Sequence, residues 1–131
     1  MKKSEEPQVQ QLMQSLWPDS KPPYDFDKEE VFVWEDTGGL LAGFASASIR
    51  PWVEGSTIEP CPHVEGWYVK PELRQHGIGK ALIEAVENWS RQQGFAELTS
   101  DVEISNYDSL NAHAALGFEP TSKIQYFKKK L

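Results

Sequence analysis

Apolar residues recur at helical spacing in two parts of the chain, and both parts are predicted to be amphipathic helices. The clearer one, 77–93, ends before Gly94, a residue that tolerates the left-handed backbone of a helix C-terminus. The other lies within the polar segment 1–16. The two apolar stripes consist of Ile78, Leu82, Val86 and Trp89, and of Val9, Leu12, Met13 and Leu16. A third helix is expected from Ser105 to Leu116, because a hydroxyl residue followed three positions later by an acid is typical of a helix start.

Runs of β-branched and aromatic residues predict the strands. The segments 31–34 and 40–49 are joined by a short link that contains Gly38 and Gly39, as in a β-hairpin. Three more strands are expected, at 63–69, 95–102 and 124–127. The order helix, three strands, helix, strand, helix, strand predicts an α/β or α+β fold in which helices pack on one sheet.

Length and composition indicate one globular domain that spans residues 1–131. Of the 131 residues, 39% are hydrophobic and 25% are charged, which is typical of a folded chain with a core. The chain has 13 Lys and Arg against 20 Asp and Glu, a formal net charge of −7. This balance argues against nucleic acid as a partner, since phosphate binding requires a basic surface. It suits a cationic substrate, or it serves solubility alone.

The single cysteine, Cys61, excludes an internal disulfide and indicates a reducing, cytoplasmic compartment. It lies in the stiff loop Glu59-Pro60-Cys61-Pro62 with no base beside it, so a nucleophilic role is not favoured. No apolar stretch is long enough for a membrane span or a signal-peptide core. No cluster of His, Cys and Asp has the spacing of metal ligands, so neither a membrane partner nor a metal is expected.

The most informative segment runs from Glu65 to Lys80 as strand, tight loop and helix. Gly77 and Gly79 flank the start of the predicted helix, where backbone N–H groups lack partners and the helix dipole is positive. Since glycine lets an anion approach the backbone, this arrangement suits a pyrophosphate. The segment is neither a P-loop nor a dinucleotide-binding fingerprint. On its own it is also compatible with an ordinary helix start.

The segment resembles the acetyl-CoA pyrophosphate loop of the GNAT superfamily of acetyltransferases. Arg74-Gln75-His76-Gly77-Ile78-Gly79 matches the pattern Arg/Gln-x-x-Gly-x-Gly/Ala. The spacing of Asn106, Ser109, His113 and Leu116-Gly117-Phe118 matches the second signature, Asn-x-x-Ala/Ser-x-x-x-Tyr-x-x-Leu-Gly-Phe. The resemblance implies a mixed, mostly antiparallel central sheet with helices on both faces. The family's N-terminal strand is missing or shortened here, because no strand precedes Val9.

Within that superfamily the chain looks most like the aminoglycoside 6′-N-acetyltransferases. The similar segments are Leu16-Trp17-Pro18, Ala47-Ser48-Ile49-Arg50, Val64-Glu65-Gly66, Thr99-Ser100-Asp101 and Tyr126-Phe127-Lys128-Lys129. The resemblance implies a bacterial, cytoplasmic, homodimeric enzyme that uses acetyl-CoA and no metal. It further implies that the enzyme acetylates the 6′-amine of an aminoglycoside, a small cationic substrate, and so confers antibiotic resistance.

The same resemblance implies which residues hold the cosubstrate. The strand at Trp67, Tyr68 and Val69 would bind the pantetheine arm through its backbone N–H groups, and these would also polarise the thioester carbonyl. Asn106 would bind the same arm, unless it only caps a helix. The pyrophosphate would lie against Gln75, His76, Gly77, Ile78, Gly79 and Lys80.

Two carboxylates are implied at the acceptor. The residue that matches Glu65 in the resembling enzymes faces the substrate amine, where a carboxylate can take a proton directly or through water. Asp101 is at the end of the next predicted strand, at a position where sheets place ligands. Both residues also have plain alternatives, a solvated acid at a strand end and a turn residue.

The resemblance is less specific about the general acid and about the residues that line the acceptor site. His113 stands where many superfamily members carry a Tyr that protonates the leaving thiolate, although a lone His on a helix is commonly structural. Tyr126 is a rival acid. Trp17 and Trp52 match positions where the family places aromatic residues around the substrate, with core packing as the alternative.

Two departures from the family concern the acceptor. The region from Trp17 to Val31 is short, and Ser122 stands where relatives often place a Glu. Three readings stay open: an aminoglycoside 6′-N-acetyltransferase, a GNAT enzyme for another amine such as a polyamine, metabolite or peptide, and a non-catalytic acyl-CoA-binding module.

Overall fold

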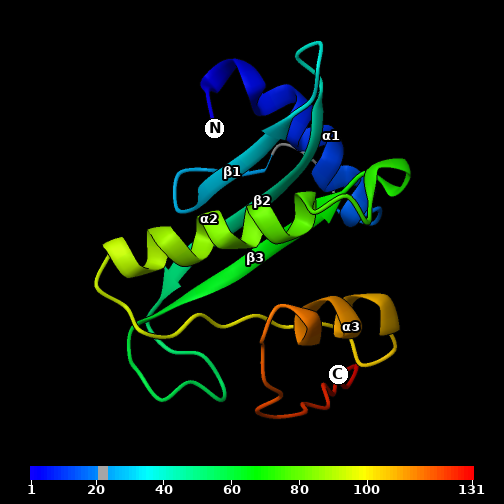
Figure 1. Cartoon of the computed structure of the whole chain (residues 1–131). Helices are drawn as coiled ribbons and strands as arrows, with labels where there is room; N and C mark the ends of the chain where they lie inside the picture. Colours follow the sequence, from blue (N-terminus) through cyan, green and yellow to red (C-terminus); the bar gives the residue numbers. More distant parts are fainter. Residues whose placement is uncertain (21–23) are drawn as a thin grey trace.

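The computed structural model describes residues 1–20 and 24–131, and its centre is an antiparallel sheet of three strands (Figure 1). The strand order is β1-β2-β3. The strands are β1 (Glu30–Glu35), β2 (Leu41–Arg50) and β3 (Cys61–Val69). The helices are α1 (Glu6–Leu16), α2 (Ile78–Gln92) and α3 (Tyr107–Ala115), with short 3₁₀ turns at Lys3–Glu5 and Pro71–Leu73.

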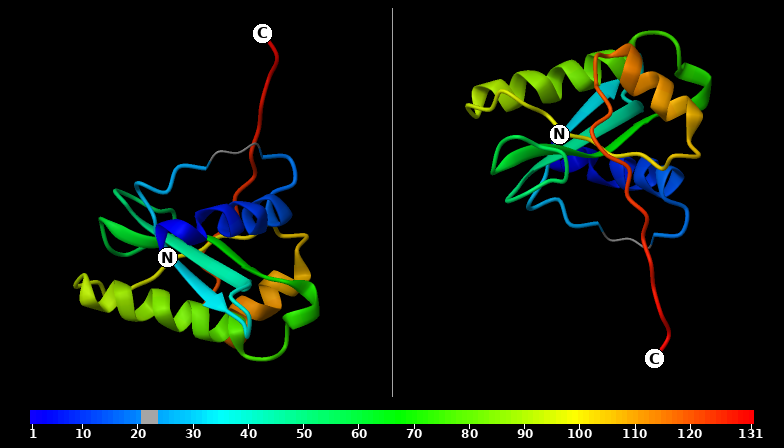
Figure 2. Two further views of the ribbon diagram at one scale, coloured as in Figure 1. Left: turned by 90° about the horizontal axis from the view of Figure 1, so that it is seen from above. Right: turned by 90° about the horizontal axis from the view of Figure 1, so that it is seen from below.

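Helices cover both faces of the sheet, as the views from above and below show (Figure 2). On one face, α1 packs against Phe44 and Leu41 of β2, and both of these side chains are fully buried. On the other face, α2 packs over alanines of β2, whose small side chains let the helix lie close to the sheet. The α2 side chains in this second core are Ile78, Leu82, Ile83 and Val86.

The structure confirms the predicted hairpin, the third strand and the three helices, with small shifts at their ends. Among the described residues no strand precedes Glu30, in line with the expected absence of an N-terminal strand. The N-cap of the third helix lies one residue later than the predicted start. Asn106, not Ser105, is its N-cap, and the Asn106 Oδ1 accepts a hydrogen bond from the Ser109 N–H at 3.2 Å.

Two predicted strands are wrong. The segment 95–102 makes only one bridge, a parallel pairing of Thr99 with His63. The segment 124–127 is extended but unpaired, and the end of the chain runs away from the sheet (Figure 2). Both segments have strand-forming side chains, but a strand also needs a partner, and no described residue supplies one to 124–127.

The strand β3 contains a β-bulge at Glu65. The register between β2 and β3 shifts between Ser46 and Ala47, so Glu65 has no partner on β2. A bulge bends its strand and changes the direction of nearby side chains.

The far edge of β3 is paired only before this bulge. The Val64 N–H donates to the Thr99 carbonyl at 2.8 Å, and the Thr99 N–H donates to the Pro62 carbonyl at 3.0 Å. Beyond Val64, no backbone hydrogen bond joins β3 to the segment after α2 in the described part of the chain. The two segments therefore part at Glu65.

None of the helices that the structure describes is long and apolar enough to cross a membrane.

Candidate active site

The candidate site is built on the edge of β3 that faces away from β2. The Lys70 N–H donates to the Ala42 carbonyl of β2 at 2.9 Å. Because successive strand residues direct their backbone groups to alternate edges, those of Val69 and Trp67 point away from β2. The Arg74 Nε donates to the Val69 carbonyl at 2.8 Å, which agrees with that direction. No described residue accepts a hydrogen bond from the Trp67 or Val69 N–H on this edge, so both are available to a ligand.

The start of α2 forms an anion-binding geometry beside this edge. Gly77 is the N-cap with φ +82°, and Gln75 also has a left-handed backbone with φ +66°. No side chain caps the helix, and its first turn contains no acidic residue. Unpaired N–H groups at the positive end of a helix dipole favour a bound anion. The first turn instead carries Lys80, whose charge favours an anion further.

Trp67 connects the strand to the helix start. Its Nε1 donates to the Gly79 carbonyl at 3.2 Å. A side-chain carbon on Gly79 would lie 3.2 Å from the Trp67 ring, so glycine is what allows this close approach.

His113 is held by hydrogen bonds at both ring nitrogens. Its Nδ1–H donates to the Ser109 carbonyl at 2.7 Å, and its Nε2 lies 2.8 Å from the Ser100 hydroxyl. The ring packs edge-on against Trp67, with centroids 5.3 Å apart. The described geometry therefore gives His113 a role in docking α3 against β3, and its role as an acid remains a prediction.

Glu65, the bulge residue, forms an ion pair that the sequence reasoning missed. Its two carboxylate oxygens accept from the Arg50 Nε and Nη2, each at 2.7 Å, and Oε1 also accepts from the Ser48 hydroxyl at 2.6 Å. Burial alone would raise the pKa of the Glu65 carboxyl, but the hydrogen bonds from Arg50 and Ser48 outweigh it and hold the pKa below its ordinary value of 4.5. A carboxylate held in this way is a weak base.

Asp101 lies beside a second residue that the sequence reasoning missed. Its Oδ2 is 3.4 Å from the Nε2 of His63, and its side chain is 78% exposed, whereas that of His63 is 2% exposed. Burial, followed by the charge of Arg50, lowers the pKa of His63 below its ordinary value of 6.5, although Asp101 acts in the opposite direction. The sequence has no local signal for this group, because the side chains that meet there depend on the β2–β3 register and on the bulge at Glu65.

The predicted aromatic residues differ in how far they are exposed to solvent. The half-buried Trp17 lies against β3, since a side-chain carbon on Gly66 would be 2.8 Å from the Trp17 ring. Trp52 follows β2 and is 58% exposed, and Tyr126 is 83% exposed. The structure therefore places Trp17 next to the strand that carries Glu65, while Trp52 and Tyr126 project into solvent.

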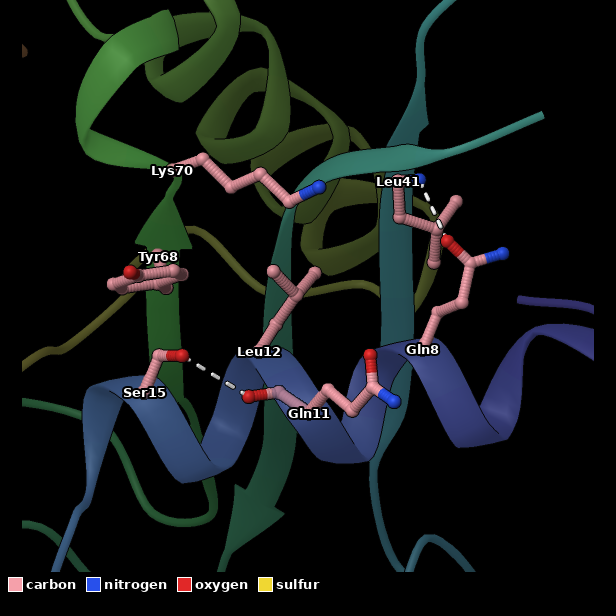
Figure 3. A pocket seen from close by; sticks show the side chains of 7 residues that line it. All are labelled: Gln8, Gln11, Leu12, Ser15, Leu41, Tyr68 and Lys70. Atoms are coloured by element: carbon pink, nitrogen blue, oxygen red, sulfur yellow. Dashed lines mark hydrogen bonds between the residues drawn. The ribbon is translucent and has the colours of Figure 1, made fainter. Parts of the chain in front are cut away.

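Two hollows in the described part of the chain lie away from the start of α2, and the first of them has Tyr68 in its wall. One, of about 160 Å³, lies between α1 and the sheet and is shown in Figure 3, where the Gln8 Oε1 accepts from the Leu41 N–H at 2.9 Å. The other, of about 440 Å³, includes Ser48, the hydroxyl partner of Glu65, in its wall. Its charged side chains are three acids and one lysine, Asp27, Glu29, Glu30 and Lys28.

Glu29 shows that the second hollow and the ion pair interact. Burial and the negative charge of Glu65 raise the pKa of Glu29 above its ordinary value of 4.5. The Arg50 charge acts in the opposite direction and lowers the pKa of Glu29.

The described residues contain no group of three or more His, Cys, Asp and Glu side chains placed to hold a metal ion.

Comparisons with a family model, with curated proteins and with solved structures all find acetyltransferases. The acetyltransferase (GNAT) family model matches residues 4–118. The aminoglycoside N(6′)-acetyltransferase type 1 of Stenotrophomonas maltophilia is 37% identical over 129 residues, which cover 92% of this chain and 84% of that protein. The protein of the same name from Salmonella typhimurium is 35% identical over 128 residues, which cover 91% and 88%. Among solved structures, AAC(6′)-Iy in complex with the bisubstrate analog CoA-S-monomethyl-acetylneamine has a TM-score of 0.87 and 34% identity, covering 100% of this chain and 95% of that one.

The lowered pKa of Glu65 leads to a prediction for stability against pH. The stabilisation that comes from ionised Glu65 is complete above the unfolded-state value near 4.5 and is lost as the pH falls through the lower folded-state pKa. The difference in the free energy of unfolding between wild type and Glu65→Gln, measured with urea, should be largest near neutral pH and shrink below pH 4.5. As a control, Glu84→Gln alters an exposed pair with Lys80 and should change stability by less than about 0.5 kcal/mol. A Glu65→Gln difference that does not vary with pH would contradict the prediction.

Proposed function

Since the chain belongs to the GNAT family of acetyltransferases, we propose that it transfers the acetyl group of acetyl-CoA to the 6′-amine of an aminoglycoside. The proposal includes a single catalytic domain over residues 1–131. The observation that carries it is the open β3 edge, whose free N–H groups lie between the glycine-flanked start of α2 and the two carboxylates Glu65 and Asp101.

The residues of the open edge fit acetyl-CoA. The N–H groups of Trp67 and Val69 can pair with the amides of the pantetheine arm as another strand would. The loop from Gln75 to Lys80 offers unpaired N–H groups to the pyrophosphate. Asn106 already accepts a hydrogen bond from Ser109, and its amide N–H₂ group can still donate to the same arm. Acetyl-CoA supplies an activated acyl group, and the reaction joins it to the amine nitrogen as the C–S bond breaks.

The acceptor end is acidic, as a polycationic substrate requires. Glu65 is ionised and fixed by Arg50 and Ser48, so we assign it to orienting the ammonium group. Asp101 is exposed and not held by an arginine, so it is the better proton acceptor of the two. Trp17 would form one wall, and the acidic hollow beside Ser48 could receive further amines of the substrate. Trp52, and an acid role for His113 or Tyr126, remain predictions.

We also propose a cytoplasmic location in a bacterium and a homodimer. Cys61 is buried and free, which suits a reducing compartment. The dimer is supported by the C-terminal segment, where Ile124, Tyr126 and Phe127 are 55%, 83% and 91% exposed. Exposed apolar side chains in a row are typical of an interaction site. Because Thr99 directs its N–H and carbonyl toward β3, the opposite edge of 98–100 is open and could pair with this segment from a second copy.

The proposed activity predicts thiol release from acetyl-CoA in the presence of kanamycin. An aminoglycoside with a hydroxyl at the 6′ position should give none, because it lacks the acceptor amine. Release with spermidine or a short peptide alone would keep the acetyltransferase and contradict the drug substrate. Saturable binding of acetyl-CoA without release from any amine would favour a non-catalytic module.

A matched pair of glycines tests the assigned pyrophosphate site. Gly77 and Gly94 flank the two ends of α2, both have positive φ, and a side-chain carbon at either meets nothing within 4 Å. Changing either to Ala should therefore cost a similar free energy of unfolding, about 1–2 kcal/mol. Only Gly77→Ala should weaken CoA binding, by about fivefold or more, because its added methyl group lies beside the N–H groups offered to the phosphate. Equal CoA dissociation constants by calorimetry would contradict the site.

The dimer predicts a change of mass when the exposed aromatic residues are removed. Joint replacement of Tyr126→Ser and Phe127→Ser should shift sedimentation from the dimer toward the 14.9 kDa of one copy. Leu40→Ser, at an apolar position of the β1–β2 hairpin that is 57% exposed, should leave the mass unchanged. Wild type that sediments as a single copy would exclude the dimer.

A further inference from the structure

A buried histidine stands behind Asp101 and is not used by the roles assigned so far. His63 is 1% exposed, and its Nε2 is buried without a hydrogen-bond partner among the described residues. Buried polar atoms are nearly always paired, so an unpaired one needs a reason. We infer that His63 is a positioning residue, which receives through Asp101 the proton that leaves the substrate ammonium. This inference rests on the proposed acetyltransferase function.

The hydrogen bonds around Thr99 allow neutral His63 to carry its ring proton on Nδ1, and the inference assigns the proton to that nitrogen. The Thr99 hydroxyl donates to the Pro62 carbonyl at 2.9 Å, and it has only one hydrogen. It lies 2.8 Å from the His63 Nδ1 and accepts from that nitrogen when its own hydrogen is directed to Pro62. In the neutral ring Nδ1 thus carries the hydrogen, and Nε2 has a free lone pair.

That lone pair faces a carboxylate with nothing between them. The Nε2 and the Asp101 Oδ2 are 3.4 Å apart, a distance at which two acceptors gain nothing from each other. A single proton placed between them would complete a charge-assisted hydrogen bond. One more proton would therefore complete the His63–Asp101 hydrogen bond. That proton can arrive through Asp101, whose side chain is 78% exposed.

The charged groups around His63 keep it neutral until a proton arrives. They are Arg50 on β2, Glu65 on β3 and Asp101 after Thr99. Arg50 and the burial of the ring lower the pKa of His63, while Asp101 and Glu65 raise it, and the result lies below the ordinary value. The Arg50 guanidinium is held by Glu65, so Asp101 is the group left to share a proton with the ring.

The proposed transfer moves one proton from the substrate ammonium to His63. An N–H bond of the substrate ammonium breaks, and its electron pair stays on nitrogen for attack on the acyl carbon. The proton passes to Asp101 and then to the His63 Nε2, where a new N–H bond forms. The resulting imidazolium is stabilised by the Asp101 carboxylate. An aspartate alone has a pKa far below that of an amine, and a histidine behind it raises the proton affinity of the pair.

Two replacements of His63 separate this role from packing. In His63→Asn the side-chain amide can still donate to Thr99, but no atom reaches Asp101. In His63→Gln a longer amide can contact Asp101 but cannot titrate. We expect wild-type kcat/KM for kanamycin to fall on the acid side with a midpoint below pH 6.5, and both variants to lack that fall.

His63→Asn should lower kcat/KM by about 10- to 100-fold, the range for residues that orient a reacting group from behind. His63→Gln should show a loss of the same order, because its amide can contact Asp101 but cannot take the proton, and CoA binding should be unchanged in both variants. A His63→Asn enzyme with the wild-type pH profile and a rate within about twofold, a change too small for a lost proton-transfer partner, would overturn the inference.

NMR of the folded wild-type protein requires no turnover, so it tests the inference independently of the proposed function. Nitrogen NMR of ¹⁵N-histidine-labelled protein should show His63 protonated at Nδ1 and bare at Nε2 near neutral pH. Asp101→Asn should lower the pKa of His63 further, because Asp101 raises it. A protonated Nε2 at neutral pH, or a pKa that ignores Asp101→Asn, would overturn the inference even if the enzyme acetylates kanamycin. Absence of turnover with the expected NMR result would contradict the function and retain the His63–Asp101 pair.

Discussion

The extra residue in β3 is the constraint on which the rest of the site depends. Because Glu65 has no partner on β2, the strand bends at that point, and its far edge leaves the segment that follows α2. The same departure exposes the N–H groups of Trp67 and Val69 and puts the Glu65 carboxylate at the point where the two segments part. One inserted residue thus provides both a binding edge for an extended ligand and a charged group at its end. A regular strand would have continued its pairing with the Thr99 segment and left no room for either.

The charges at that point form one connected group. Arg50 holds Glu65, and the charges of Arg50, Glu65 and Asp101 all act on His63. The net charge of −7 gave only a general hint of a cationic substrate. The structure shows where part of this negative charge lies, because the acidic hollow next to Ser48 is beside the same ion pair. Partial burial makes these charge interactions stronger than they would be in water. Because the carboxylates are buried to different extents, their environments also differ.

Periodic and local features of the fold could be predicted from the sequence, and features that depend on distant pairing could not. The helix 78–92 was predictable because its apolar stripe and Gly94 are local signals. Strand propensity alone failed for 95–102 and 124–127, since a strand exists only where another backbone accepts it. The glycine-flanked helix start was predictable from the family motif, whereas the roles of Glu65 and Asp101 stay predictions. Arg50 and His63 were missed, because a partner for Glu65 depends on the β2–β3 register and on a bulge, and neither has a local signal.

The burial pattern has a consequence for how firmly different parts of the chain are folded. No residue after Ser90 is buried, and α3 has no buried side chain, so the last third is held by half-buried contacts and the Thr99 bridge. The first 90 residues contain the buried side chains of both cores and are therefore the more stable part of the chain. Asp101, Asn106 and His113 lie in the less stable part, whereas Glu65 and the start of α2 lie in the more stable one. A ligand that contacts both would join two parts of unequal stability, and amide hydrogens of the last third would become slower to exchange with solvent when it binds.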